Sequence, residues 1–282
     1  MIEVRPRSPV MGAEVSGVDL SHPLDEKTFR EILDAFHRHM LLVFPDQDLD
    51  EGQQVAFSRR FGELQIHVLE QYRHRRHPEI YVLSNVDAAT GRTTGTHPDK
   101  GTLVWHSDLS FVPRPALATA LYGIEVPAAG GDTLYADMCA VYDALDEETK
   151  KRLAKMKAVH DINVSRVRAG EAPMSERQRA EAPPVEHPAV RIHPATGRKV
   201  LYVSRHASLI AGMPHAESDA LLERLQAHAT SERFVYRHRW RARDLVIWDN
   251  RCTMHCATPY DPGAERRVMH RTVVKGDAPV PA

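Results

Sequence analysis

The sequence predicts a mainly β fold with flanking helices, of the sandwich or jelly-roll kind. The middle and C-terminal parts contain many short segments rich in β-forming residues, separated by Gly, Pro and Asp. Few helical patterns lie between these segments, which is typical of packed sheets. The chain has 282 residues and 42% hydrophobic content, which suffices for a sizeable core.

The N-terminal quarter alternates predicted strands and helices. Residues Ala13–Leu20 alternate apolar and polar side chains, as a half-buried strand does. Asp25 is a suitable N-cap for a following helix. The apolar stripe of that helix consists of Phe29, Ile32, Leu33 and Phe36. A short apolar run, Met40–Phe44, ends at a proline and indicates a buried strand. Asp50 and Gln53 then match a capping box, which predicts a second helix.

The rest of the chain is predicted to be rich in strands. The candidate strands are Tyr81–Leu83, Leu117–Ile124, Val200–Val203, Phe234–Trp240 and Leu245–Trp248. Helical patterns occur at Glu147–Val159 and at Ser218–Ala229, where leucines recur at helical spacing. Between them, Asn163–His187 is polar, rich in Arg, Glu and Pro, and lacks clear periodicity. Because long irregular insertions in compact domains are often lids or binding loops, we expect one at about residues 160–190.

Charge and composition argue against several classes of partner. The formal net charge is −1 and the pI is near 7.0, so no global field draws the chain to nucleic acid or to an anionic membrane. The basic run Arg237–Arg241 alternates like a strand, and we interpret it as a solvated face. No apolar run is long enough to span a bilayer, and the N-terminus lacks the pattern of a signal peptide. We therefore expect neither a nucleic-acid nor a membrane partner.

The cysteines indicate a reducing compartment. Cys139, Cys252 and Cys256 form a small, odd set in a long chain, which does not suggest a disulfide framework. Cys252 and Cys256 have a spacing that could suit zinc, but no obvious second pair completes such a site. The sequence therefore predicts three reduced thiols in a cytoplasmic protein.

Two histidines and one aspartate form a candidate metal site. In an extended strand, residues i and i+2 face the same side, so His106 and Asp108 can both face one metal. His255, far along the chain, supplies a second imidazole. Two histidines and one carboxylate on one face of Fe(II) leave three open positions, which is room for a chelating keto acid and O₂. Zinc also accepts such ligands, so the pattern alone leaves the metal open.

An alternating segment near the C-terminus supplies candidate cations for a carboxylate ligand. In residues 265–271 the alternation places Arg267, Met269 and Arg271 on one strand face. A dicarboxylate co-substrate needs a cation beyond the metal, and an arginine can pair with a carboxylate through two hydrogen bonds. Thr133, which follows two glycines, could place a hydroxyl beside the same carboxylate. The alternative is that Arg267 and Arg271 form a solvated face.

With these elements in this order, the sequence resembles the taurine dioxygenase / 2,4-dichlorophenoxyacetate dioxygenase family of 2-oxoglutarate-dependent oxygenases. The resemblance spans nearly the whole chain, from Gly12 to Val274. It is carried by Phe61-Gly62-Glu63-Leu64, Trp105-His106-Ser107-Asp108, Gly130-Gly131-Asp132-Thr133, Trp248-Asp249-Asn250-Arg251 and Arg266-Arg267-Val268-Met269-His270-Arg271. It implies a single domain over residues 1–282, built as a double-stranded β-helix (jelly roll) with helices packed outside.

The resemblance also implies the ligands of the core chemistry. It implies Fe(II) on His106, Asp108 and His255, and 2-oxoglutarate on Thr133 and Arg267, with O₂ as the other co-substrate. The iron supplies the oxidative chemistry, and the protein supplies position and charge.

The features that concern the primary substrate are mixed. Arg271 matches the arginine that holds the acidic group of the substrate, and His67 matches a histidine that contacts the sulfonate in taurine dioxygenases. Two other taurine contacts, a Tyr and an Asn, fall here at about Glu70 and Thr102, which argues against taurine itself. The stretch His206-Ala207-Ser208 is more similar to the dichlorophenoxyacetate enzymes.

We therefore expect an Fe(II)- and 2-oxoglutarate-dependent dioxygenase that hydroxylates a small anion. An aryloxyalkanoate, cleaved to a phenol and a keto acid, is the favoured substrate, and an alkyl sulfonate or a sulfate ester is the alternative. Two alternatives come from other classes: a non-catalytic jelly-roll binding protein, and a zinc hydrolase with the same three ligands. A homo-oligomer, dimer or tetramer, is also expected.

Overall fold

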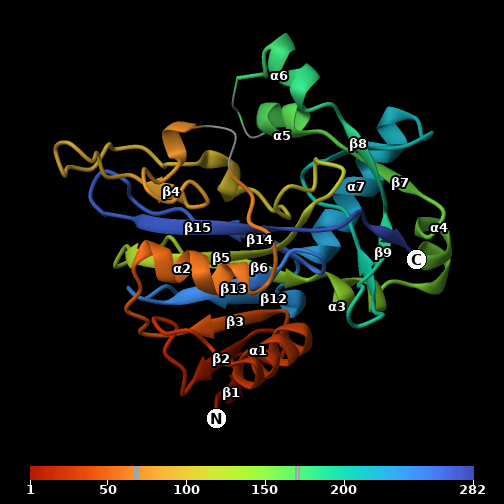
Figure 1. The fold of residues 1–282 in the computed structure, drawn as a ribbon. Helices are drawn as coiled ribbons and strands as arrows, with labels where there is room; N and C mark the ends of the chain where they lie inside the picture. Colours follow the sequence, from red (N-terminus) through yellow and green to blue (C-terminus); the bar gives the residue numbers. More distant parts are fainter. Residues whose placement is uncertain (67–69, 169, 171) are drawn as a thin grey trace.

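Two β-sheets packed face to face form the centre of the molecule. The computed structural model describes residues 1–66, 70–168, 170 and 172–282. The larger sheet has the order β1-β2-β3-β13-β5-β15-β4, and the sheet opposite it has the order β12-β6-β14 (Figure 1). The fold is a jelly roll, as the sequence predicted.

The strands of the two central sheets are short, apart from two long central ones. The larger sheet consists of β1 (Glu3–Pro6), β2 (Ala13–Ser16), β3 (Leu41–Phe44), β13 (Leu245–Asp249), β5 (Ala116–Glu125), β15 (Val268–Lys275) and β4 (Tyr81–Ser84). The smaller sheet consists of β12 (Val235–His238), β6 (Thr133–Asp137) and β14 (Thr253–Ala257). All neighbours in these two sheets pair antiparallel except β2 and β3, which are parallel.

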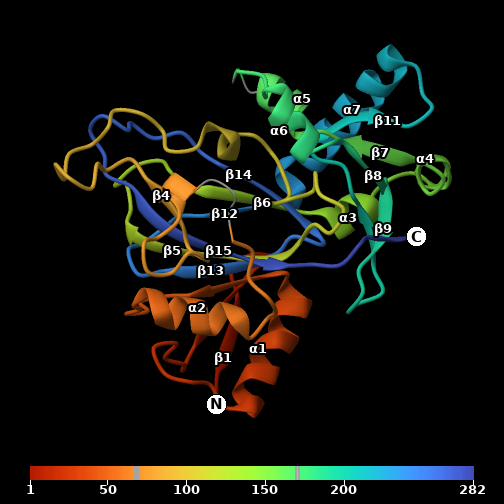
Figure 2. The same ribbon diagram turned by 45° about the horizontal axis from the view of Figure 1, so that its top comes forward.

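The larger sheet is buried on both faces, which explains its continuous apolar runs. Leu245 and Ile247 of β13 pack into a core beneath the N-terminal helices, whereas Val246 and Trp248 pack into the core between the sheets. The N-terminal helices α1 (Glu26–His39) and α2 (Glu51–Arg59) cover the outer face, away from α7 (His215–Ala229) (Figures 1 and 2).

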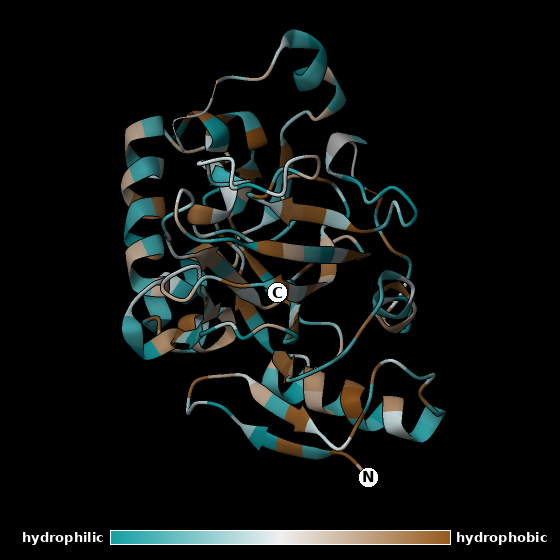
Figure 3. Cartoon of the chain, turned by 90° about the vertical axis from the view of Figure 1, so that its left-hand side faces the viewer, coloured by the Kyte–Doolittle hydropathy of each residue, from teal (hydrophilic) through white to brown (hydrophobic). Residues whose placement is uncertain are grey.

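Local capping defines both N-terminal helices as the sequence predicted. The Asp25 side chain accepts a hydrogen bond from the Thr28 amide at the start of α1. Asp50 and Gln53 form a reciprocal capping box at the start of α2. Hydrophilic and hydrophobic residues alternate along α1, beside the N-terminal strands (Figure 3). Its buried residues are Phe29, Ile32, Ala35 and Phe36, which form one apolar stripe.

Two smaller sheets and four short or medium helices lie at one end of the sandwich. The sheets have the orders β11-β7-β8 and β10-β9-β16. Their strands are β7 (Lys157–His160), β8 (Val185–Pro188), β9 (Val190–Ile192), β10 (Lys199–Leu201), β11 (Ala207–Ile210) and β16 (Val280–Pro281). The remaining α-helices are α3 (Met138–Asp143), α4 (Glu147–Leu153), α5 (Ile162–Arg168) and α6 (Glu176–Glu181). Short 3₁₀ turns are η1 (Glu70–Tyr72), η2 (Lys100–Leu103) and η3 (Glu232–Phe234).

Three sequence predictions of secondary structure need correction. The predicted helix Glu147–Val159 ends at Leu153, and its last residues enter β7, because this segment pairs with β8 and β11 on its two sides. The predicted strand Ala13–Leu20 ends at Ser16. The predicted irregular insertion, Asn163–His187, contains most of α5, all of α6 and the start of β8. Local periodicity missed these short elements because tertiary pairing and capping define them.

Several other features agree with the sequence. The arginines of the basic run Arg237–Arg241 are exposed, whereas His238 and Trp240 between them are buried. The three cysteines are buried and unpaired. Within the described part of the chain, none of the helices has the length and apolar character needed to cross a membrane.

Candidate active site

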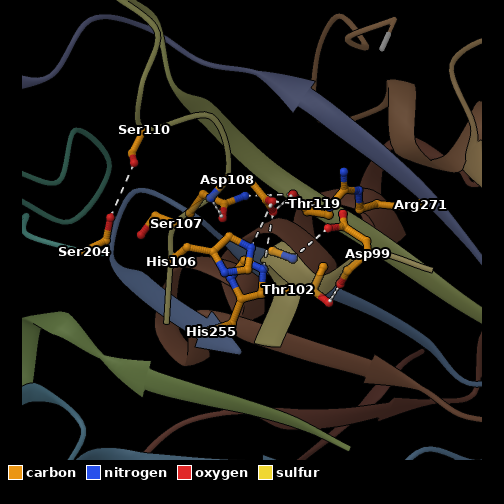
Figure 4. Close-up of polar contacts among 12 residues, drawn as sticks. Asp99, Thr102, His106, Ser107, Asp108, Ser110, Thr119, Ser204, His255 and Arg271 are labelled. Atoms are coloured by element: carbon orange, nitrogen blue, oxygen red, sulfur yellow. Dashed lines mark hydrogen bonds and ion pairs between the residues drawn. The ribbon is translucent and has the colours of Figure 1, made fainter. Parts of the chain in front are cut away.

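The structure brings the three predicted metal ligands together. The candidate ligand atoms of His106, Asp108 and His255 all lie within 4.8 Å of one another, and all three residues are buried. The Nε2 atom of His106 lies 3.8 Å from Oδ1 of Asp108, and Nε2 of His255 lies 3.6 Å from Oδ2 of the same carboxylate. The side chains point toward one another in Figure 4.

The two histidines are held in place by backbone pairing. The amide of His106 donates to the carbonyl of His255 at 2.9 Å, and the His255 amide donates back at 2.8 Å. This isolated bridge places residue 106 beside β14. Asp108 itself lies in a turn in which Leu109 has φ +54°. The prediction of an extended strand through both residues was therefore wrong, although the predicted convergence of the side chains was right.

Both imidazoles are suited to bind a cation through Nε2. The Nδ1 atom of His106 lies 2.7 Å from the carbonyl oxygen of Val104. Because a carbonyl only accepts, this contact places the proton on Nδ1 and leaves the Nε2 lone pair free. Burial, together with the neighbouring His106 ring, lowers the pKa of His255 to about 3, so that this ring is neutral at pH 7. Neutral imidazoles are the form that binds metals.

The carboxylate of Asp108 is held by a buried hydrogen-bond network. The Thr119 hydroxyl donates to Oδ2 of Asp108 at 2.6 Å, and Nδ2 of Asn250 donates to the Thr119 oxygen at 2.9 Å. The Asn250 oxygen accepts from the Asp108 amide and from the Trp248 indole, both at 3.1 Å. Burial alone would raise the pKa of Asp108, but His255, Arg271 and the Thr119 hydroxyl lower it below its ordinary value.

The other end of the site contains a buried arginine. Arg267, just before β15, is only 4% exposed, and no acidic side chain among the described residues forms an ion pair with it. Its amide donates to Oδ1 of Asn85 at 2.7 Å, which fixes the backbone at this point. Burial lowers the pKa of Arg267 despite the nearby Tyr260 and Tyr135. A buried guanidinium without an anionic partner is costly, so a carboxylate ligand would stabilise it.

The glycine pair before Thr133 is required by close packing. Gly130 has φ +75°, and a Cβ there would lie 2.3 Å from the carbonyl oxygen of Pro259. A Cβ on Gly131, which has φ +66°, would lie 3.5 Å from Nε of Arg267. This turn leads directly to Thr133, whose hydroxyl accepts from the Trp240 indole at 3.0 Å. A hydroxyl oxygen that accepts can also donate its own proton, so the Thr133 hydroxyl can serve a ligand as a donor.

One cavity joins these groups. Its lining includes Thr133, His255, Arg267, Arg271, Leu83 and Leu121. Arg267 and Arg271 therefore face the same space, as their spacing on an alternating strand predicted. The alternative that both form a solvated face is wrong.

Arg271 lies close to the metal ligands. Its NH1 atom is 3.6 Å from Oδ1 of Asp108, and its guanidinium carbon is 4.6 Å from the ring centroid of Tyr81. The Arg271 side chain is only 13% exposed, and its Nε atom is buried without a hydrogen-bond partner in the described part of the chain. The guanidinium therefore has unused donor capacity beside the cavity.

The remaining substrate predictions have different outcomes. His67 lies outside the described residues, so its contact with a substrate stays a prediction. Thr102 lines the cavity, but the side chain of Glu70 is 84% exposed and pairs with Arg73. His206 is buried beside His106, with ring centroids 5.9 Å apart, and its Nδ1 atom lies 2.9 Å from the Ser110 hydroxyl.

Sequence reasoning missed the residues that support the ligands. Thr119 lies in the predicted strand Leu117–Ile124 and was not singled out. The only available signal was one threonine among apolar and aromatic residues. Asn250 belongs to a recognised landmark, but its contacts to Asp108 and Thr119 arise only when β13 pairs with β5.

Comparison with known proteins identifies the class. Residues 3–273 match the family described as "Taurine catabolism dioxygenase TauD, TfdA family". The chain belongs to this family, and it is an Fe(II)- and 2-oxoglutarate-dependent dioxygenase.

The relatives include enzymes that are named for aryloxyalkanoates. The chain is 38% identical over 286 residues to the alpha-ketoglutarate-dependent 2,4-dichlorophenoxyacetate dioxygenase of Cupriavidus pinatubonensis, covering 99% of each chain. It is 36% identical to the (S)-phenoxypropionate/alpha-ketoglutarate-dioxygenase of Sphingobium herbicidovorans, covering 98% of this chain and 95% of the relative. The solved structure of AAD-2 in complex with Mn(II) and N-oxalylglycine superposes with a TM-score of 0.90 at 36% identity, covering 99% of this chain and 98% of that one.

The residues of the site fit these cofactors. Two imidazoles and one carboxylate are a donor set that suits Fe(II). Arg267 is a buried cation without an acidic partner among the described residues, and the nearby hydroxyl of Tyr260 is buried without a hydrogen bond there. A dicarboxylate such as 2-oxoglutarate would supply the missing acceptors.

Proposed function

We propose that this enzyme hydroxylates an aryloxyalkanoate next to its ether oxygen, with cleavage to a phenol and an oxo acid. The observation that carries the proposal is a second arginine, Arg271, in the same cavity as Arg267 and beside the candidate metal ligands. One arginine for 2-oxoglutarate leaves the other for the anionic group of the substrate. The names of two relatives, the 2,4-dichlorophenoxyacetate dioxygenase and the (S)-phenoxypropionate dioxygenase, support the aryloxyalkanoate class.

His106, Asp108 and His255 would hold the iron through Nε2, a carboxylate oxygen and Nε2. Iron held there supplies the oxidative chemistry, in which O₂ is consumed, 2-oxoglutarate gives succinate and CO₂, and one oxygen atom enters a substrate C–H bond. Thr119 would keep the carboxylate oriented, because its hydroxyl donates to Oδ2 of Asp108 at 2.6 Å.

Arg267 would bind the distal carboxylate of 2-oxoglutarate, and the Thr133 hydroxyl would donate to the same group. Both residues are buried, so each hydrogen bond to a carboxylate forms in a region of low dielectric constant and is strong. Binding there also removes the cost of burying the Arg267 charge without an anionic partner.

Arg271 would bind the carboxylate of the primary substrate. Since its guanidinium lies 3.6 Å from the Asp108 carboxylate, the bound carboxylate and the carbon next to it would lie close to the metal ligands. Leu83 and Leu121 offer apolar surface in the same cavity for an aromatic ring. Hydroxylation of the carbon that bears the ether oxygen gives a hemiacetal. Its C–O bond to the aryloxy group breaks as the hydroxyl proton leaves, which yields the phenol and the oxo acid.

A panel of anions and matched neutral esters tests the substrate class. Aryloxyalkanoates, alkyl sulfonates, sulfate esters and the methyl esters of the first group are compared by succinate release with Fe(II) and 2-oxoglutarate. We expect aryloxyalkanoates to be the best substrates and their methyl esters to be poor. In Arg271→Ala, the KM for the acid should rise strongly and the affinity for 2-oxoglutarate should change little. Equal turnover of acids and esters would show that Arg271 does not select an anion.

The panel also separates the alternatives. If alkyl sulfonates or sulfate esters are the best substrates, Arg271 still binds an anion, but the aryloxyalkanoate class is wrong. We further propose that residues 160–190 act as a lid over a single domain, that His67 contributes to the anion site, and that the enzyme is a cytoplasmic homo-oligomer. No nucleic-acid or membrane partner is proposed.

A further inference from the structure

A histidine in the cavity has a buried ring nitrogen with no assigned function. His97 lies in the loop between β4 and η2 and lines the same cavity as Arg267 and Thr133. Its Nε2 atom is buried and has no hydrogen-bond partner in the described part of the chain. Because an unpaired buried donor costs free energy, this atom needs an explanation.

The local hydrogen bonding defines which nitrogen of His97 carries the proton. The Asp99 amide donates to Nδ1 of His97 at 3.2 Å, so Nδ1 is an acceptor. A neutral imidazole with an acceptor Nδ1 carries its proton on Nε2. Burial, together with the nearby charge of Arg267, lowers the pKa of His97, which keeps the ring neutral at pH 7. The unpartnered Nε2 is therefore an N–H donor.

The surroundings of His97 show at which end of the cavity it lies. Its ring centroid lies 5.4 Å from that of Tyr260. The charge of Arg267 acts on both His97 and Tyr260. The side chain therefore belongs to the Arg267 end of the cavity, while Arg271 lies beside the candidate metal ligands.

We propose that His97 is a ligand-binding residue whose Nε2–H donates to the distal carboxylate of 2-oxoglutarate beside Arg267. This inference rests on the proposed role of Arg267. A carboxylate can accept about four hydrogen bonds, so one guanidinium and the Thr133 hydroxyl leave room for a further donor. His97 would thereby make the pocket selective for 2-oxo acids that carry a second carboxylate.

Direct binding to the metal-loaded protein tests this role without turnover. The affinities for 2-oxoglutarate and for N-oxalylglycine, in which an N–H replaces a methylene group, are measured by anaerobic calorimetry with Mn(II). His97→Phe keeps an aromatic ring against Tyr260 but removes the donor. His97→Gln keeps an N–H donor near the position of Nε2. We expect His97→Phe to bind both ligands about 10- to 100-fold more weakly, as for loss of a hydrogen bond to a charged group, and His97→Gln to recover most of the affinity.

Two controls make the result specific. The first is 2-oxobutyrate, a 2-oxo acid without the distal carboxylate. It should bind more weakly than 2-oxoglutarate, and its affinity should be the same for His97→Phe as for the unmodified protein. The second is Arg267→Ala, which should lose affinity for 2-oxoglutarate under the same conditions. Thermal denaturation confirms folding of each variant, and His97→Leu replaces His97→Phe if the latter does not fold.

The outcomes separate the role of His97 from the role of Arg267. If His97→Phe binds 2-oxoglutarate normally while Arg267→Ala does not, the role of His97 is wrong and the proposed function stands. If neither substitution weakens binding, the assignment of this end of the cavity to 2-oxoglutarate is itself wrong. Equal losses for 2-oxobutyrate and 2-oxoglutarate would place the contact of His97 away from the distal carboxylate and would overturn the inference.

Discussion

Replacing Thr119 by valine should weaken metal binding without changing any ligand. The Thr119 hydroxyl is fully buried and donates to Oδ2 of Asp108 at 2.6 Å, and its oxygen accepts from Asn250 at 2.9 Å. Valine has nearly the same shape but cannot donate. A hydrogen bond to a charged group contributes about 1.5–3 kcal/mol, which corresponds to an affinity loss of roughly 10- to 150-fold. Loss of outer-sphere partners typically has an effect of this size on metal affinity.

Titration of the apo-protein with Mn(II) or Fe(II) under anaerobic conditions measures this loss. Thr119→Ser keeps the hydroxyl and should retain most of the affinity. Ser58→Ala is a matched control, because Ser58 shares a buried hydroxyl contact of 2.7 Å with Thr272 but lies on α2, on the outer side of the larger sheet. Metal affinity that is normal in Thr119→Val, in a variant that remains folded, would refute the argument that this network orients Asp108.

Three further predictions concern single substitutions. His255→Ala should abolish turnover and metal binding while the protein stays folded, and calorimetry with Mn(II) together with circular dichroism measures both. Arg267→Ala should raise the KM for 2-oxoglutarate strongly, whereas Arg266→Ala should not, because Arg266 pairs with Glu125 at the surface. Asp249→Asn should destabilise the fold by about 3–5 kcal/mol at neutral pH, since it breaks the buried ion pair in which NH2 of Arg251 lies 2.6 Å from Oδ2 of Asp249. The pKa of Asp249 is lowered in the folded protein. Its contribution to the free energy of unfolding is therefore present above the pKa of about 3.9 in the unfolded state, and it is lost as the pH falls below that value. Denaturation of Asp249→Asn and of the unmodified protein is measured as a function of pH. The difference between their free energies of unfolding should narrow only in acid.

The elements that the sequence predicted well are those defined by neighbouring residues. The caps Asp25 and Asp50 act on amides within three residues, so their effect is visible in the sequence. The jelly-roll fold and the type of site also follow from short motifs that retain their order along the chain. His106, Asp108 and His255 were recognised by residue type, and the structure confirms that they converge.

The features that the sequence did not predict depend on long-range pairing. Residues 157–159 continue a helical pattern, but pairing with β8 and β11 on both sides makes them a strand. Thr119 and Asn250 are 131 residues apart in the chain, and only the pairing of β5 with β13 brings them to Asp108. The contact of Asp249 with His193 also depends on long-range pairing, since His193 lies in the region after the insertion.

The central claim is that this enzyme couples oxidation of 2-oxoglutarate to cleavage of an aryloxyalkanoate, and isotope labelling tests it most directly. An aryloxyacetate is incubated with 2-oxoglutarate, Fe(II) and labelled dioxygen, and phenol, succinate and label are quantified in the same samples. Arg271→Ala and protein loaded with Zn(II) serve as controls. We expect equal amounts of phenol and succinate, with label from dioxygen in succinate, and little of either product from the two controls. Phenol formed with Zn(II), or without dioxygen and succinate, would contradict the account and would indicate a hydrolase.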